Sequence, residues 1–192
     1  MFSQADSFTL FGVQIFDNFV REKCTAISLA IENFSDDEIL GSENNLEQTI
    51  QRLISNYSIT PLSISFDKES VRITPYTKDI YVRDVFNRQA LVPRAYVRYS
   101  IPVSGNLELL KTCPYSYLQT KIKVEFKNNY LEFELDTRYA TVEFPEEKKR
   151  EINNAALNTK DFILKTSTDL NNSVEKFNAG LISITHYKVI LM

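Results

Sequence analysis

The strongest constraint on the fold comes from residues 144–192, which hold no proline beyond Pro145 and no glycine before Gly180. Within this segment large apolar side chains recur every seventh residue, with a second apolar set beside them. Such a heptad-like stripe predicts one long helix that packs along its length. Pro145 suits the first position of that helix, and Glu146 and Glu147 suit the positive end of its dipole. The stripe consists of Ile163, Leu170, Val174, Phe177, Leu181, Ile184 and Leu191.

The stripe also predicts an interface, because it runs to the end of the sequence without a cap or a polar tail. We expect the chain to continue past Met192 and its seam to contact a second subunit or a further domain. Charged residues typical of a free coiled coil are sparse, so packing against the chain's own domain is an equal alternative. The β-branched residues after Gly180 leave a strand open as another reading of the last residues. The seam residues expected to be exposed are Phe177, Leu181, Ile184 and Leu191.

The segment KIKVEFKNNYLEFELD, residues 121–136, predicts a β-hairpin. Asn128 and Asn129 at its centre suit a two-residue turn, because asparagine tolerates a positive φ angle. This register places Phe126 opposite Leu131 and gathers the apolar residues of both strands on one face. The polar face then pairs Lys123 with Glu134, Lys121 with Asp136, and Glu125 with Glu132.

Helices are expected before the sheet. Apolar residues at helical spacing predict one helix over residues 8–24 and a second over residues 44–57. Between them, residues 25–34 (TAISLAIENF) place an apolar or β-branched residue at alternate positions, which favours a strand over an extension of the first helix. The SDDE segment that follows resembles a capping box.

The middle of the chain changes to the period of β-strands. PLSISF and VRIT flank the turn DKES and predict a strand pair, and DIYVRDVF and AYVRYSIPV predict two further strands. Pro93 and Pro102 confine these segments to strand ends or a sheet edge. NLELLKTCP, after Gly105, is typical of a short helix that Pro114 ends.

Together these patterns predict an α+β fold. An antiparallel, strongly twisted sheet extends from about residue 61 to residue 136, with helices before it and a long helix after it. We assign residues 1–143 to an α+β domain and residues 144–192 to the long helix, which we expect to lead into a further C-terminal region. The 192 residues suffice for one sizeable domain.

Composition narrows the classes of function. The formal net charge of −3 disfavours a dedicated nucleic-acid-binding protein but is compatible with a local basic patch. Cys24 and Cys113 lack metal-binding spacing, and His186 is the only histidine, so we predict no metal site, no cofactor and no catalytic residue. Because neither a signal peptide nor an apolar run of membrane-spanning length is recognisable, we expect a cytoplasmic protein that does not enter a membrane.

The strongest candidate binding site is YVRDVFNRQALVPRAYVRYS, residues 81–100. Arginines clamp phosphates and aromatic rings stack on bases, so this mixture suits nucleic acid or a nucleotide. A regular strand would place Tyr96 and Arg98 on one face. The alternative is a solvated strand face whose arginines pair with acidic groups of the same chain. The candidate residues are Arg83, Arg88, Arg94, Arg98, Tyr81 and Tyr96.

A metal-dependent nuclease fragment is a further alternative. Glu125 and Lys127 form the ExK half of a nuclease motif, which also needs an acidic residue such as Asp84 converging on it. The same glutamate fits the solvated face of the predicted hairpin, and ExK is common by chance.

Three segments carry a resemblance to a known class of protein: ISNYSITPLSISFDKESVRI, YSIPVSGNLELLKTCPYSY and VEKFNAGL. In this order they resemble an N-terminal module of bacterial multidomain proteins of the antiviral-defence or restriction type. The resemblance implies a non-catalytic sensor, scaffold or oligomerisation module that acts through protein–protein contacts, with an effector domain beyond Met192. It implies no catalytic residues, and the basic RK stretch expected after the helix is not in this sequence.

Overall fold

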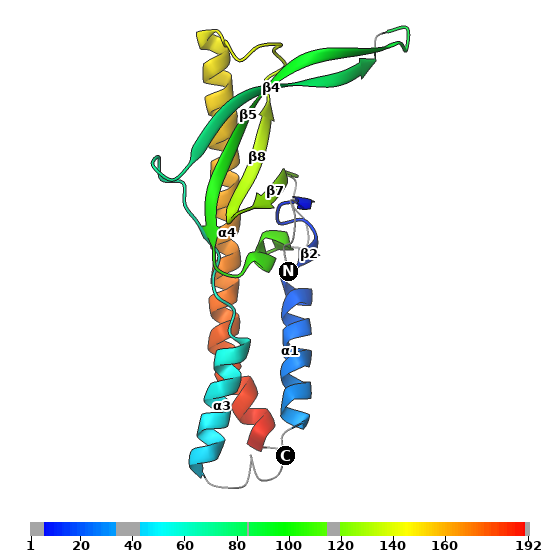
Figure 1. Ribbon diagram of the computed structural model, residues 1–192. Coiled ribbons are helices and arrows are strands. Elements are labelled where there is room, and N and C mark those ends of the chain that lie inside the picture. The colour runs from blue at the N-terminus through cyan, green and yellow to red at the C-terminus, as the bar shows by residue number, and fades with distance from the viewer. Residues whose placement is uncertain (1–5, 34–42, 84, 115–119, 191–192) are drawn as a thin grey trace. The chain divides into compact units, whose positions relative to one another are not determined.

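The structure is a computed structural model that describes residues 6–33, 43–83, 85–114 and 120–190, with side chains described for 7–33, 47–83, 85–114 and 120–183. These residues form an α+β fold with an antiparallel sheet and a long C-terminal helix, as predicted (Figure 1). The chain packs as two compact units, each assembled from several stretches of sequence. The first comprises Met1–Leu10, Ser63–Ser104 and Thr120–Lys165, and the second comprises Phe11–Leu62, Gly105–Gln119 and Thr166–Met192.

The described strands of the first unit form a six-stranded antiparallel sheet, in the order β1-β7-β8-β5-β3 with β4 also paired to β5. The long strand β5 organises this sheet, because it pairs with β4 along Gln89–Ser100, with β8 along Tyr96–Pro102 and with β3 at Val103 and Ser104. The strands are β1 (Asp6–Thr9), β3 (Ser63–Ile64), β4 (Arg72–Arg83), β5 (Gln89–Ser104), β7 (Lys123–Lys127) and β8 (Tyr130–Asp136).

The predicted hairpin is confirmed in β7 and β8. Its register places Phe126 opposite Leu131, and the turn residues Asn128 and Asn129 have φ angles of 52° and 64°. Asparagine is among the residues that adopt this left-handed conformation most readily, so the turn and the apolar alternation specify the same register.

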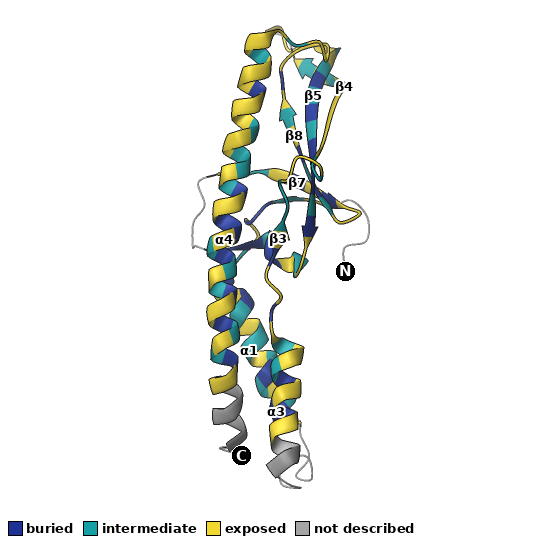
Figure 2. Ribbon diagram, turned by 90° about the vertical axis from the view of Figure 1, so that its left-hand side faces the viewer, coloured by how far each residue is buried: buried dark blue, intermediate teal, exposed yellow. Residues whose placement is uncertain are grey.

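One face of the sheet is apolar and packs on the first part of helix α4 (Glu146–Ile190), which begins next to Pro145 as predicted. In Figure 2 the side of this part of α4 that faces the sheet is buried or half-buried, while the opposite side is exposed. Removing these side chains from water stabilises the unit. Its buried apolar residues include Ala95, Val97, Tyr99, Ile101, Val103, Val124, Phe126, Leu131, Phe133, Ile152 and Ile163.

The second unit is mainly helical. Helices α1 (Phe16–Glu32) and α3 (Glu43–Tyr57) lie beside the last part of α4 in Figures 1 and 2. A short parallel pair joins β2 (Gln14–Ile15) to β6 (Thr112–Cys113), next to the 3-10 helix η1 (Leu107–Lys111) that corresponds to the short helix predicted before Pro114. The buried apolar residues include Phe19, Ile27, Ile31, Ile50, Leu53, Leu170, Val174, Phe177 and Leu181.

Two expectations for the N-terminal region are wrong. Residues 25–32 are helical and do not form a strand, since α1 runs through Glu32. The alternating residues also fit the spacing of a helix, since Ile27 and Ile31 are four residues apart and both are buried on α1. The first helix also begins at Phe16 rather than near residue 8, because β1 and β2 precede it. The predicted capping box at SDDE lies outside the described residues.

The strand pairing in the middle of the chain also differs from the expectation. PLSISF contributes only β3, which pairs with β5 and not with VRIT. VRIT and the first part of DIYVRDVF join in the single long strand β4, which pairs with β5 along its whole length. At the other end of the chain, α4 remains helical from Leu181 onward, so the alternative strand is wrong. The domain boundary proposed at residue 143 stays a prediction.

Candidate functional site

Glu134 is the centre of a polar network on the face of the sheet opposite the apolar one. Its Oε1 accepts hydrogen bonds from the Tyr76 hydroxyl and from Nε and Nη2 of Arg98, at 3.1 and 2.7 Å for the arginine. Its Oε2 accepts a hydrogen bond from Lys78 Nζ at 3.0 Å. The Tyr76 and Tyr96 rings stack at 5.8 Å, and Lys78 Nζ lies 4.1 Å from the centroid of the Tyr96 ring. Charge-assisted hydrogen bonds thus tie β4, β5 and β8 together.

The acidic residues of β8 form ion pairs with residues of β4 and β5, and not with the lysines before and in β7 as predicted. Asp136 Oδ1 accepts a hydrogen bond from Arg94 Nε at 2.9 Å, and Glu134 pairs with residues of β4 and β5. Within the described residues neither is joined to Lys121 or Lys123, so the ion pairs expected across the hairpin are wrong. A hairpin considered alone omits the second neighbour of β8, which is β5 and supplies the long arginine side chains.

The network shifts the protonation of its members. Burial alone would raise the pKa of Glu134, but the hydrogen bonds from Tyr76, Arg98 and Lys78 overcome it and lower the pKa to about 2. The hydrogen bond to Glu134 raises the pKa of Lys78 and that of Arg98. Burial, together with the hydrogen bond to Glu134, raises the pKa of Tyr76. The charged forms of the carboxylate and its two cations are therefore favoured in the folded protein.

Replacing Glu134 by glutamine is expected to lower the free energy of unfolding at pH 7 by about 1–2 kcal/mol, because an uncharged amide oxygen attracts the Arg98 and Lys78 cations less strongly than a carboxylate does. The folded-state pKa of about 2 lies below the ordinary value of 4.5, so this contribution is fully present above pH 4.5. It is lost as the pH falls from 4.5 toward 2. The difference between wild type and variant should therefore shrink on acidification, as measured by urea unfolding at several pH values.

Glu125→Gln is the matched control, because Glu125 lies on the same sheet face and makes no ion pair with any described residue. It should change stability little at any pH. A constant difference between wild type and Glu134→Gln from pH 7 to pH 2.5 would contradict the network's role, since the carboxylate would then not be the group that matters.

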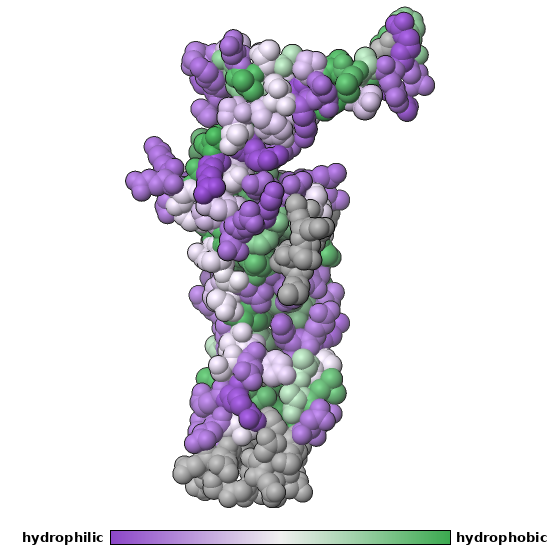
Figure 3. All heavy atoms as spheres, viewed as in Figure 1, coloured by the Kyte–Doolittle hydropathy of each residue, from purple (hydrophilic) through white to green (hydrophobic). Residues whose placement is uncertain are grey.

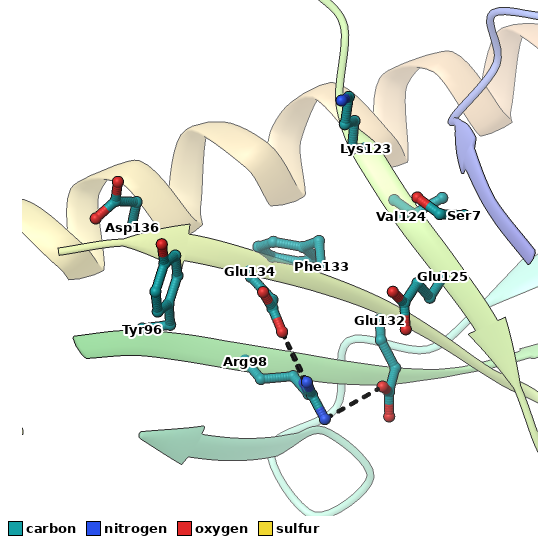
Figure 4. Close-up of a pocket in the computed structure, with 10 residues that line it drawn as sticks. All are labelled: Ser7, Tyr96, Arg98, Lys123, Val124, Glu125, Glu132, Phe133, Glu134 and Asp136. Carbon is teal, nitrogen blue, oxygen red and sulfur yellow. Dashed lines mark hydrogen bonds and ion pairs between the residues drawn. The ribbon is translucent and has the colours of Figure 1, made fainter. Parts of the chain in front are cut away.

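The same face contains a hollow with a volume of about 280 Å³ (Figure 4). Carboxylates predominate around it, and Glu125 faces Glu132 across β7 and β8, as the register predicted. Arg98 compensates part of this negative charge, since its Nη1 lies 3.9 Å from Glu132 Oε2, and Glu132 Oε1 also accepts a hydrogen bond from Ser100 Oγ at 2.9 Å. The hollow is lined by Ser7, Tyr96, Arg98, Lys123, Val124, Glu125, Glu132, Phe133, Glu134 and Asp136.

The nuclease alternative gains no support from this geometry. In the part of the chain that the structure describes, no group of three or more histidine, cysteine, aspartate or glutamate residues is arranged to hold a metal ion. Asp84, the acidic residue proposed to converge on Glu125, lies outside the described residues, as does the side chain of His186.

The structure divides the six arginine and tyrosine candidates among three locations. Tyr96 and Arg98 share the polar face, as predicted, and Arg94 lies on it too. Arg94 and Arg98 are paired with acidic side chains of β8, which is the alternative to nucleic-acid binding considered above. Tyr81 and Arg83 lie on the opposite face of the ribbon, and Arg88 lies beside the turn that joins β4 to β5. The six candidates therefore do not form one surface.

An exposed ribbon is the feature that the sequence did not reveal. Beyond the end of β8, β4 and β5 continue alone as a two-stranded projection, residues 78–83 and 85–94, which we call the arm (Figure 1). Apolar groups gather along it between hydrophilic ones in Figure 3. In the sequence from residue 78 to residue 94, the basic residues Lys78, Arg83, Arg88 and Arg94 outnumber the acidic residues Asp79 and Asp84. Its large exposed apolar residues are Tyr81 (74%), Val85 (93%), Phe86 (75%) and Leu91 (55%).

The predicted seam of α4 is not an exposed surface. Phe177 and Leu181 are 8% and 0% exposed, so the expectation that they are exposed is wrong. Ile163, Leu170 and Val174 are each 0% exposed as well. The apolar stripes of α1 and α3 provide a partner for a helix stripe within the same chain. The side chain of Ile184 and all of Leu191 lie outside the described residues.

Comparison with known proteins adds no relationship. No protein-family model matches the chain, and neither a curated protein nor a solved structure is significantly similar to it. None of the described helices combines the length and the apolar character needed to cross a membrane.

Proposed function

We propose that this chain is a non-catalytic protein-interaction module whose contact surface is the arm. The observation that carries the proposal is the exposure of Tyr81, Val85, Phe86 and Leu91 on a ribbon that neither α4 nor β8 covers. Apolar side chains that are exposed together mark interaction sites, whereas single scattered ones are normal on a protein surface, and tyrosine is among the residues enriched at the energetic centres of protein interfaces.

The role as a sensor or scaffold in bacterial antiviral defence is part of this proposal and is supported only by the resemblance of three short sequence segments. The structure supplies a folding reason for two of those segments. Asn178 of VEKFNAGL hydrogen-bonds the backbone of Ile59 in ISNYSITPLSISFDKESVRI. The contact surface proposed from the structure is the arm, in place of the buried seam of α4.

Nucleic-acid binding is the second candidate, and the basic balance of the arm favours it. Lys78, Arg83, Arg88 and Arg94 are concentrated there in a chain whose formal net charge is −3. Two observations weigh against it: Arg94 and Lys78 are paired with Asp136 and Glu134. Cations that already have carboxylate partners release fewer counterions from a phosphate backbone.

Site-specific photo-crosslinking in cells tests the proposal without weakening the surface. A photoreactive phenylalanine derivative is introduced at Tyr81 or Phe86 and, as a control, at Leu157, which is 55% exposed on α4. We expect protein adducts from positions 81 and 86 and none above background from position 157. Adducts that nuclease treatment removes would support the nucleic-acid alternative instead. Equal adducts from all three positions would contradict a role of the arm.

A further inference from the structure

The outer edge of β4 is open. Among the described strands β4 pairs only with β5, so one side of its backbone has no strand partner. An open edge in a long strand is a template for the addition of another strand. Pro75 cannot donate a backbone hydrogen bond and limits pairing near the start of the strand. The stretch from Tyr76 to Arg83 is thus the part that is able to accept a partner.

The charged residues along this edge are complementary to those of a second, antiparallel β4 strand. Asp79, Tyr81 and Arg83 alternate along β4 and therefore share one face of the ribbon. Asp79 makes no ion pair with a described residue, and the side-chain contact of Arg83 is a hydrogen bond of 3.4 Å from Nη1 to Asn87 Oδ1. Both charged groups are exposed and available to a partner.

Only one register satisfies both charges. Residues directly opposite in an antiparallel pair lie on the same face, so Asp79 is able to meet only residues of its own face. Of the basic residues of β4, Arg72 and Lys78 lie on the other face and Arg83 lies on this one. When two antiparallel β4 strands are related by a two-fold axis at Tyr81, Asp79 of each copy lies opposite Arg83 of the other.

We propose that the partner bound by the arm is a second copy of this chain, joined through antiparallel β4–β4 pairing centred on Tyr81. This inference rests on the proposed function and names its partner. The pairing extends the sheet across the two copies, places the two Tyr81 rings together and forms two interchain ion pairs. Leu91, which lies opposite Tyr81 within the ribbon, adds apolar surface on the same face. A two-fold contact of this type is self-closing and yields a dimer.

Charge exchange tests the register. Wild-type chain should sediment as a monomer–dimer equilibrium. Asp79→Arg and Arg83→Asp each replace two opposite-charge pairs by two like-charge pairs, so each should raise the dimer dissociation constant by at least about tenfold. An equimolar mixture of the two variants should form a heterodimer, because the arginine introduced at position 79 then faces the aspartate introduced at position 83. Recovery in the mixture also shows that both variants are folded.

Two outcomes overturn the inference. Wild-type chain that stays monomeric up to about millimolar concentration, where weak specific contacts become populated, shows that the edge does not pair with itself. A dimer that both single variants retain shows that another surface joins the copies. In either case the crosslinking experiment tests the proposed function separately. If position 81 forms adducts whose mass corresponds to a different protein, the arm is still a contact surface, although its partner is not a second copy.

Discussion

Replacement of Gly105 by alanine is expected to lower the free energy of unfolding by about 3–5 kcal/mol, at the upper end of the range for single substitutions. Gly105 has a φ angle of +94°, which side chains rarely adopt, and an added Cβ would lie 2.1 Å from Pro61 O and 3.0 Å from Pro61 C. The neighbouring backbone holds this approach in place, since Asn106 N donates a hydrogen bond to Thr60 O at 3.2 Å. Relief of the overlap would break that contact. Urea unfolding followed by circular dichroism measures the loss.

Gly180→Ala is the matched control. Gly180 lies within α4, and an added Cβ meets no atom within 4 Å. Alanine is favoured over glycine inside a helix by roughly 0.5–1 kcal/mol, so this variant should be slightly more stable than wild type. If both variants had the stability of wild type, the close approach of Gly105 to Pro61 would not exist in solution.

The features that the sequence predicted correctly depend on neighbours along the chain. The β7–β8 hairpin needs only an asparagine turn and apolar alternation, and both lie within residues 121–136. The long helix α4 needs only an initiating proline and a segment without breakers. In each case local preference and apolar pattern agree, so no distant partner has to be known.

The features that were missed depend on distant neighbours. Residues 25–34 have a pattern that fits strand or helix, and the decision lies with the residues that bury Ile27 and Ile31. The pairing of β3 and β4 is decided by β5, a strand of 16 residues that both of them contact. A turn between PLSISF and VRIT was locally plausible, but the longer strand offers more pairing than a short hairpin does.

In the candidate site, too, the features that depend on nearby residues were predicted and those that depend on distant residues were missed. Alternation along a strand predicted that Tyr96 and Arg98 share a face, which is confirmed. It did not reveal that Glu134 and Asp136 lie beside Arg98 and Arg94, because β8 is distant in sequence. The arm was missed for a related reason. Whether Tyr81 and Leu91 lie in a core or on an uncovered ribbon depends on where β8 ends and where α4 lies, and neither is written in residues 78–94.

Two asparagines lie among the apolar residues of the α4 seam because they hold another segment of the chain. Asn171 and Asn178 are seven residues apart on the helix, and each binds the backbone of the segment that leads into β3. Asn171 Oδ1 accepts a hydrogen bond from Leu62 N at 2.8 Å, and its Nδ2 donates one to Leu62 O at 2.7 Å. Asn178 makes the same pair of bonds to Ile59, at 2.9 and 2.8 Å. The two asparagine amides thus make the backbone hydrogen bonds that a neighbouring strand would otherwise provide to this extended segment.

Replacing Asn171 by leucine is therefore expected to lower the free energy of unfolding by about 2–4 kcal/mol. The substitution leaves the N–H and C=O of Leu62 without partners in a residue that is 3% exposed, and each such group costs about 1–3 kcal/mol. Urea unfolding measures the total, and amide hydrogen exchange at Leu62 should quicken while exchange at Phe133, in the other unit, is unchanged. Asn172→Leu, at an exposed position of the same helix, should have little effect. Equal stability of the two variants would mean that the apolar stripe alone holds the segment to α4.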